Sequence, residues 1–202
     1  MSAKKVSEST ELPSGFRYEQ DFLDVNEEAN LLERFRNLEF RPFNFQGYVA
    51  KRRIVEYGFQ YDFTSRHTTA TEAIPDFLQG LREKAATWAE VATAEIVEAV
   101  VTEYPPGAPI GWHRDVPQFD VIIGISVAGS CRMRLKPYKD KGRINSVTLE
   151  PRSVYAMRGI ARWHYQHSIP PVKELRYSVT FRTLNQSRKV SIEKLNRKSA
   201  PS

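Results

Sequence analysis

The chain has 202 residues, of which 41% are apolar and 11% aromatic, so it can form one domain with a core and is not an intrinsically disordered protein. Its one cysteine, Cys131, excludes an internal disulfide and a cysteine-rich zinc site. No run approaches the roughly 20 apolar residues of a membrane span, and the N-terminal segment lacks the apolar core of a signal peptide. We therefore expect a cytoplasmic protein with no membrane partner.

Most of the net positive charge lies at the C-terminus. The net charge is +6, and residues 185–202 contribute +4 of it through five basic side chains and one acidic one. A basic tail of this kind is most often a solvated segment, although it also suits a nucleic-acid partner. We expect residues 1–13 to form a disordered arm, residues 14–184 a single domain, and residues 185–202 a flexible basic tail.

Two predicted helices come first. One begins after Asp24, an N-cap residue with Glu27 in the capping-box position, and is expected to end at the Arg-Pro pair at 41–42. Residues 43–63 are rich in Phe, Tyr and Val, which predicts strands with connecting turns. Pro75 is expected to open the second helix, because apolar side chains recur at helical spacing after it.

The second half of the chain predicts strands. They are expected at residues 96–104, 119–127, 131–135, 163–169 and 176–184, with two more between residues 147 and 157 and an extended segment from residue 112. Two early helices followed by many short strands indicate an α+β fold. A sheet sandwich or jelly roll is expected behind the helices.

The last predicted strand alternates between polar and apolar side chains. Period two places Arg176, Ser178, Thr180 and Arg182 on one face. The simpler interpretation is an antiparallel strand with one solvated face. The alternative is the lumen of a barrel that holds an anion, since a guanidinium group binds a carboxylate through two hydrogen bonds and two arginines match a dicarboxylate.

Residues 111–115, Gly-Trp-His-Arg-Asp, contain the most informative pattern of the chain. His113 and Asp115 point the same way if the segment is extended, so they can bind one metal ion from one side. His167, on a later predicted strand, can supply the third ligand. Two imidazoles and a carboxylate that leave the opposite side of the metal open are typical of non-haem Fe(II) oxygenases.

Other interpretations of these residues compete with a metal centre. A single histidine such as His113, His164 or His67 is more often a surface or core residue than a ligand. The His-Arg-Asp tripeptide also occurs in protein kinases, but the other kinase motifs are missing. Zinc is the competing metal, and three N/O ligands near anion-binding arginines favour iron and an organic acid instead. His164 is three residues from His167, so in an extended segment the two face opposite ways.

Three blocks of the sequence, in order and correctly spaced, resemble the AlkB family of Fe(II)- and 2-oxoglutarate-dependent dioxygenases. Tyr-Pro-Pro-Gly at residues 104–107 with His-Arg-Asp at residues 113–115 resembles N-x-Y-x-P-G…H-x-D. Residues 159–169 resemble G-x-x-R…H-x-I, and residues 176–182 resemble R-x-N-x-T-F-R. Ser126 takes the place of the serine in the family's I-S-L strand.

This resemblance implies the fold and the metal centre. The core would be a double-stranded β-helix (jelly roll) with two N-terminal helices packed on it and an N-terminal substrate lid at about residues 41–66. His113, Asp115 and His167 would hold Fe(II), 2-oxoglutarate would be the cosubstrate, and O2 would take the last coordination site.

The resemblance also implies the cosubstrate contacts. Tyr104 and Arg176 would hold the far carboxylate of 2-oxoglutarate, and Arg182 would act near the metal. Thr102 and Ser178 stand beside the cosubstrate at positions where the family usually has Asn. They keep a hydroxyl group but lose the second partner that an amide offers.

The activity implied is the oxidative dealkylation of N-alkylated bases in DNA or RNA, with release of an aldehyde, succinate and CO2. Basic and aromatic residues alternate in the predicted lid, as a flipped base and its phosphates require. Val116-Pro117 follows Asp115 where nucleobase repair enzymes of the family often have a further acidic residue. The residues predicted to contact substrate are Tyr48, Lys51, Arg52, Arg53, Tyr57, Tyr61 and Trp112.

Three alternatives stay open for the substrate. The composition of the predicted lid also suits an ordinary sheet with exposed lysines and a packed aromatic face. An AlkB-like enzyme can instead oxidise a protein side chain or modify tRNA, or the pocket can be inert in a protein that only binds nucleic acid. We expect the protein to be a monomer.

Overall fold

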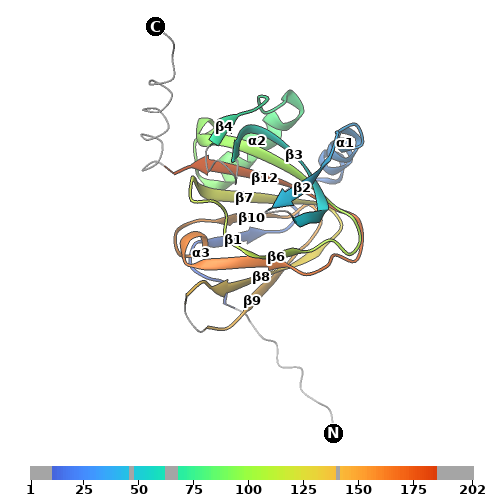
Figure 1. Cartoon of the computed structure of the whole chain (residues 1–202). Coiled ribbons are helices and arrows are strands. Elements are labelled where there is room, and N and C mark those ends of the chain that lie inside the picture. Colours follow the sequence, from blue (N-terminus) through green and yellow to red (C-terminus); the bar gives the residue numbers. More distant parts are fainter. Residues whose placement is uncertain (1–10, 46–47, 62–67, 140–141, 186–202) are drawn as a thin grey trace.

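The structure is a computed structural model that describes residues 11–45, 48–61, 68–139 and 142–185. Two antiparallel sheets lie one above the other, and helices α1 and α2 lie beyond the larger sheet (Figure 1). The α+β class and the two-sheet architecture agree with the sequence prediction. No helix in these ranges is long and apolar enough to cross a membrane.

Residues 11–13, predicted to belong to a disordered arm, lie against the domain. Pro13 is buried, and Leu12 packs on the apolar side chains of the core. The Pro13 carbonyl accepts a hydrogen bond from the Phe16 amide at 2.9 Å, which leads the chain into strand β1 (Phe16–Glu19). The predicted arm therefore overlaps the domain at Leu12 and Pro13, because both are apolar and cover core surface. Residues 1–10 and 186–202 lie outside the described part, so the arm and the tail stay predictions.

Helix α1 (Val25–Phe35) begins where its capping residues predict. Oδ1 of Asp24 accepts hydrogen bonds from the Asn26 and Glu27 amides, and the Asp24 amide donates to the Glu27 carboxylate, all at 2.8 Å. The helix ends at Phe35, before the predicted Arg-Pro pair, because tight turns redirect the chain into strand β2 (Arg41–Phe45).

Helix α2 (Asp76–Ala89) starts directly after Pro75, as predicted. Its buried Leu78 shares one apolar cluster with Phe35 of α1 and with Phe181 of the last strand. The helices therefore bury their apolar sides against the outer face of the larger sheet, which leaves its inner face available for a pocket.

The larger sheet has the strand order β1-β10-β7-β12-β5-β3-β2, with β4 paired to β3 outside this path. A short 3-10 turn (Thr93–Glu95) leads from α2 into it. Strands β5 and β12 have the predicted bounds, and β7 is one residue longer than predicted. The strands not yet given are β3 (Tyr48–Tyr61), β4 (Thr68–Ala70), β5 (Ile96–Tyr104), β7 (Phe119–Ala128), β10 (Val154–Met157) and β12 (Arg176–Leu184).

The smaller sheet has four strands in the order β6-β11-β8-β9. Strands β5, β6, β7 and β8 alternate between the two sheets along the chain, as do β9 to β12, and this winding is that of a jelly roll. The strands are β6 (Ile110–His113), β8 (Cys131–Pro137), β9 (Asn145–Leu149) and β11 (Tyr165–Ile169).

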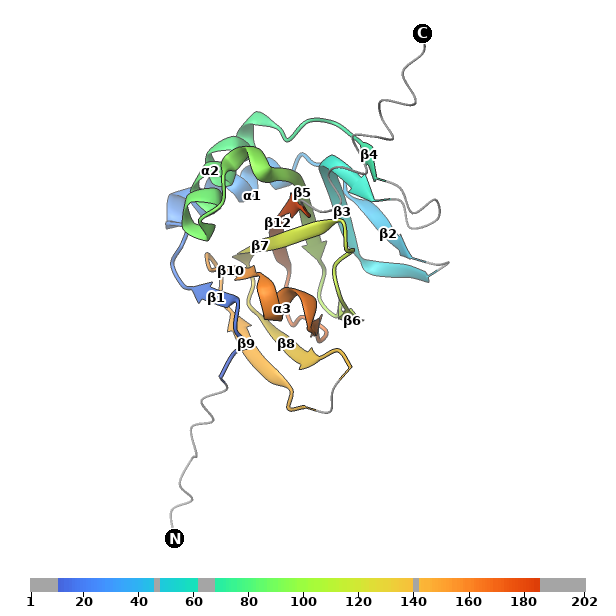
Figure 2. The same ribbon diagram turned by 90° about the vertical axis from the view of Figure 1, so that its left-hand side faces the viewer.

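A short helix that the sequence did not predict precedes β11. Residues Gly159–Trp163 form α3, so Trp163, expected at the start of a strand, is helical (Figure 2). Gly159 has a positive φ of 51°, a conformation that glycine adopts at little cost and that lets the chain turn into the helix. Five residues are too few to show a helical period, which explains the error.

Candidate metal centre and cosubstrate pocket

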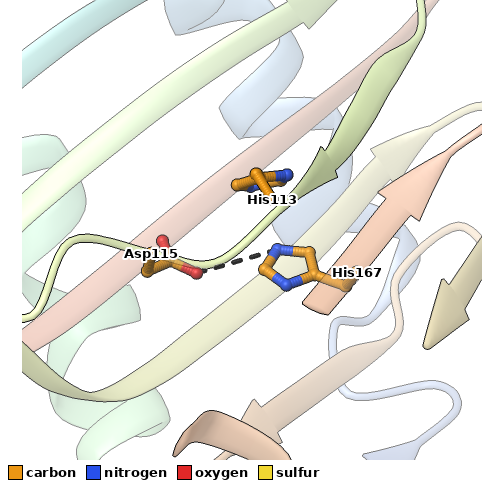
Figure 3. A group of neighbouring side chains, drawn as sticks. All are labelled: His113, Asp115 and His167. Atoms are coloured by element: carbon orange, nitrogen blue, oxygen red, sulfur yellow. Dashed lines mark ion pairs between the residues drawn. The ribbon is translucent and has the colours of Figure 1, made fainter. Parts of the chain in front are cut away.

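The three predicted metal ligands lie together. His113 is the last residue of β6, Asp115 follows in the loop, and His167 is the register partner of His113 on β11. One ligand atom from each residue lies within 4.8 Å of the other two, and the imidazole centroids are 4.2 Å apart. Figure 3 shows the His167 ring directed at the Asp115 carboxylate, where Nε2 and Oδ2 are 3.7 Å apart.

The protonation of the three side chains suits a cation. Nδ1 of His113 lies 2.9 Å from the Gly111 carbonyl, which as acceptor places the proton on Nδ1 and leaves Nε2 for a metal. Burial lowers the pKa of both imidazoles, that of His167 to about 3, so both are neutral at pH 7. Burial raises the pKa of Asp115, but the nearby positive charge, chiefly that of the Arg182 guanidinium, outweighs this and holds it well below its usual range.

Arg182 fixes the orientation of the Asp115 carboxylate. Its Nε and Nη2 donate to Oδ1 of Asp115 at 3.0 and 2.8 Å, while Nη1 contacts the buried carboxylate of Glu98. Oδ2 of Asp115 is buried and has no hydrogen-bond partner among the described residues. A buried carboxylate oxygen without a donor is costly unless a cation binds it, so the residues fit a metal ion.

Arg162 supports the loop that carries Asp115. Its guanidinium is 3% exposed and donates to the carbonyls of Asp115, Val116, Phe119 and Asp120 at 2.8 to 3.2 Å. A side chain from α3 thus ties together four carbonyls of this loop. Arg162 falls in the block at residues 159–169 that resembles the family motif, but no role was predicted for it.

Arg176 is the first residue of β12, the strand that also carries Arg182, and 1% of its surface is exposed. Its Nε donates to Ser126 Oγ at 3.1 Å, and its guanidinium lies 4.8 Å from the centroid of the Tyr104 ring. Nη1 has no hydrogen-bond partner, and no carboxylate pairs with Arg176 within the described ranges. A fully buried cation of this kind calls for an anionic ligand, which fits the far carboxylate of 2-oxoglutarate.

The predicted cosubstrate residues lie between Arg176 and the metal ligands. Thr102 and Ser178 are register partners on β5 and β12, and Ser178 is in turn the partner of Ser126 on β7. All predicted members of the set line one cavity of about 470 Å³. These members are Thr102, Tyr104, Arg176, Ser178 and Arg182.

Two further pocket residues were missed by the sequence analysis. Tyr155 of β10 lies across β7 against Gly124, where a Cβ atom would be 2.3 Å from the tyrosine ring. Glu98 of β5 is 2% exposed, and burial raises its pKa to about 7 although the Arg182 guanidinium lowers it. Both faces of β5 are buried, so its sequence shows no alternation that would single out Glu98.

Strand β3 presents only part of the predicted substrate set to the cavity. Arg52 lines it, whereas its neighbours Lys51 and Arg53 point to the other face, as strand alternation requires. Arg53 pairs with Glu103 at 2.7 Å on that outer face. Tyr57 is buried in the apolar cluster under the helices, so its predicted contact with substrate is wrong. A phosphate contact by Lys51 or Arg53 stays a prediction, now from the face away from the cavity.

The remaining predicted residues have other positions. Trp112 borders the cavity, but Arg134 and Lys136 lie 4.9 and 4.4 Å from the centroid of its ring. Tyr48 and Tyr61 stand at the two ends of β3, and their side chains lie outside the described residues. His164 is exposed at the end of α3, whereas His167 lies in the group with His113 and Asp115. This agrees with His167 as the third metal ligand.

Comparisons with known proteins agree with this site. The family profile described as 2OG-Fe(II) oxygenase superfamily matches residues 15–188. An uncharacterized protein of Acanthamoeba polyphaga mimivirus is 25% identical over 199 residues, with 91% of each chain covered. The "Alkylated DNA repair protein ALKBH8 homolog" of Arabidopsis thaliana is 27% identical over 74% of this chain and 49% of its own length. The chain therefore spans about half of that plant relative.

Two further similarities concern a longer enzyme and the fold. The mouse "tRNA (carboxymethyluridine(34)-5-O)-methyltransferase ALKBH8" is 27% identical over 80% of this chain and 25% of its own length. The solved structure of OsALKBH1 superposes with a TM-score of 0.66 at 18% identity, covering 86% of this chain and 98% of that one. A Trichoplax adhaerens prolyl hydroxylase in complex with a peptide gives a TM-score of 0.64 at 13% identity, covering 87% and 86%.

Three observations lead to one assignment. The family profile matches most of the chain, and His113, Asp115 and His167 lie together as a metal-binding group. The buried guanidinium of Arg176 has no carboxylate partner among the described residues. The chain belongs to the 2OG-Fe(II) oxygenase superfamily, in which it is an AlkB-like dioxygenase that uses Fe(II) and 2-oxoglutarate.

Proposed function

We propose that the protein oxidatively dealkylates N-alkylated bases in DNA or RNA. The observation that carries this proposal is the placement of Arg52 and Phe43 on the cavity wall, with the guanidinium 4.3 Å from the centroid of the phenyl ring. An aromatic plane and a cation on one wall suit a flat base and the phosphate attached to it. The hairpin of β2 and β3 that carries both residues is then the substrate lid.

Bound Fe(II) and 2-oxoglutarate supply the oxidation, in which one atom of O2 enters succinate with loss of CO2 and the other enters the N-alkyl carbon, which leaves as an aldehyde. The residues of the chain bind and orient the reactants. Arg176 and Tyr104 bind the far carboxylate of the cosubstrate. Arg182 keeps Asp115 ionised and turned toward the metal. The apolar Val100 and Val116 line the cavity and exclude water from it.

The names of the relatives support a nucleic-acid substrate. The plant relative is called an alkylated DNA repair protein, and the mouse relative is a tRNA methyltransferase that is four times longer than its matched part. The fold shared with a prolyl hydroxylase bound to a peptide supports the second candidate, oxidation of a protein side chain. Arg52 on the cavity wall favours a nucleic-acid substrate, because a basic residue in the same cavity as the metal ligands suits a phosphate.

The test is the coupled formation of succinate and aldehyde by the purified chain. The substrates are single-stranded DNA and RNA oligonucleotides methylated on a ring nitrogen, the same sequences without methyl groups, and a proline-containing peptide. We expect the methylated oligonucleotides to give equal amounts of succinate and formaldehyde, and the unmethylated oligonucleotides and the peptide to give no formaldehyde. Stimulation by the peptide and by no oligonucleotide would support the second candidate and contradict the first. Asp115→Ala serves as the inactive reference.

A further inference from the structure

The outer face of the smaller sheet is basic. Side chains of β8 alternate, so Met133 and Leu135 are buried while Arg132, Arg134 and Lys136 point outward. Their register partners on β9 and β11 are small or neutral and polar. None of the described residues of β6, β8, β9 and β11 is acidic. The sheet therefore presents a row of cations at a repeat of roughly 7 Å along β8.

Among the residues that the structure describes, no carboxylate pairs with these cations. Arg132 donates to the Ser146 hydroxyl at 2.8 Å and Arg134 to the Ser168 hydroxyl at 3.0 Å, both neutral groups. No ion pair in the described part of the chain involves Arg132, Arg134 or Lys136. By contrast, Arg17 and Lys84 on the helical side both pair with glutamates. No acidic group of the described residues neutralises the charge of the β8 row, which can therefore attract an anionic partner.

Trp112 holds two of the three cations in place. It reaches across β11, so that the Arg134 guanidinium and the Lys136 ammonium lie 4.9 and 4.4 Å from its ring centroid. Cation–π contacts of this kind restrict long side chains before any ligand arrives, which lowers the entropy lost on binding. The Trp112 ring, predicted to contact substrate, therefore also orders the basic row.

The basic row is continuous with the mouth of the active site. Trp112 and Arg114 flank the metal ligand His113, and both border the cavity. The Arg114 guanidinium lies 3.7 Å from the ring centroid of Tyr138, just beyond the end of β8. The row thus starts beside the metal and runs away from it across the smaller sheet, at the end of the molecule opposite to helices α1 and α2 (Figures 1 and 2).

We propose that this face, defined by Arg132, Arg134, Lys136, Trp112 and Arg114, binds the phosphate backbone of a single-stranded nucleic acid whose reacting base enters the cavity. The proposal rests on the proposed function. Guanidinium groups bind phosphates through two hydrogen bonds, and a flat sheet with basic and aromatic side chains is suited to an unpaired strand. An acidic protein segment is the rival partner.

The test measures how salt affects oligonucleotide binding to the full chain. A labelled, unmodified single strand of roughly 15 nucleotides is titrated with the wild type, with Arg132→Ser/Lys136→Ser, and with Arg34→Ser/Arg36→Ser as matched control. The control removes the same charge from exposed positions on α1, across the larger sheet. DNA, RNA, a duplex of the same sequence and poly-glutamate are compared, and circular dichroism confirms that each variant is folded.

We expect the β8 variant to bind the single strand about tenfold more weakly at low salt. The slope of log K against log salt should fall by about 1.4, since each phosphate contact in a single strand contributes about 0.7. The control should keep the wild-type affinity and slope. Equal losses in both variants, or tighter wild-type binding to poly-glutamate than to either single strand, would overturn the proposal.

Binding and turnover separate this inference from the proposed function. If the β8 variant loses oligonucleotide affinity while no methylated base is ever dealkylated, the basic face stands and the proposed reaction fails. If dealkylation occurs and the two variants bind equally, the reaction stands and the basic face fails.

Discussion

Arg182 binds Asp115 through one carboxylate oxygen, Oδ1, and donates no hydrogen bond to the other, Oδ2. Two donors of the guanidinium meet Oδ1, and the buried Oδ2 has no partner among the described residues. The same guanidinium contacts Glu98, whose side chain is 2% exposed, against 6% for Asp115. The metal ligand is therefore oriented by an arginine that is itself anchored in the sheet, and Oδ2 lies 3.7 Å from Nε2 of His167.

Substitution of Arg182 should weaken Fe(II) binding without removing a ligand. In Arg182→Gln, Asp115 loses charged hydrogen bonds worth on the order of 1.5–3 kcal/mol, so the Kd for Fe(II) should rise roughly ten- to a hundredfold. The variant should also unfold more easily, because buried Glu98 loses its counter-ion. Anaerobic Fe(II) titration and thermal unfolding measure the two effects.

The double variant Arg182→Gln/Glu98→Gln separates the effect on Fe(II) affinity from the effect on stability. It should recover most of the lost stability but none of the lost Fe(II) affinity. If it recovers both, Arg182 acts through stability of the sheet and does not orient Asp115.

Arg176→Ala should raise the 2-oxoglutarate requirement. Loss of a charged partner to a carboxylate in a dry pocket costs about 1.5–3 kcal/mol, so KM for 2-oxoglutarate should rise roughly ten- to over a hundredfold. The matched control is Tyr177→Phe, one residue along the strand and packed against Phe35 of α1 on the opposite face. A change of less than about threefold in Arg176→Ala would place the cosubstrate carboxylate elsewhere.

Arg162→Met should release the loop that carries Asp115. Four carbonyls lose the Arg162 donor, and a buried acceptor left without a partner costs on the order of 1–3 kcal/mol, so both stability and Fe(II) affinity should fall. Limited proteolysis should then cut near residues 115–119 in the variant and not in the wild type. Intact protection with normal iron binding would show that the loop holds its shape without Arg162.

Strand alternation on β3 gives a matched pair for the substrate. Arg52→Ala should weaken binding of a methylated oligonucleotide, with the greater loss at low salt, because Arg52 lines the cavity. Lys51→Ala removes the same charge from the outer face and should have little effect. In both variants, succinate formation without substrate should stay as in the wild type. Equal effects on oligonucleotide binding would contradict the placement of Arg52.

Sequence alone predicted the strands that carry the site. The period of two on residues 176–184 correctly placed Arg176, Ser178, Thr180 and Arg182 on one face, and this face lines the cavity. Asp24 and Pro75 correctly marked the helix starts, because capping is a local property. Periodicity thus predicted the strands with a long pattern, and the capping residues predicted where the helices begin.

The errors arose where the outcome depends on tertiary contacts. The sequence of β3 supplied candidate residues but not the face that meets the cavity, so Lys51 and Arg53 were proposed together with Arg52, and Tyr57 was assigned wrongly. Trp112 was expected at the substrate, and the cations that cover its ring come from β8, two strands away. The contact of Arg182 with Glu98 joins residues far apart in the chain, which no local pattern reports.

The comparison of His167→Ala with His164→Ala tests the central claim most directly. His167 faces Asp115 across the metal centre, whereas His164 is exposed at the end of α3. Iron-dependent formation of succinate and formaldehyde from a methylated oligonucleotide is measured for both variants and the wild type. We predict full activity for His164→Ala and loss of both products, with loss of Fe(II) binding, for His167→Ala. Retained iron-dependent turnover in folded His167→Ala would contradict the assignment of the metal centre.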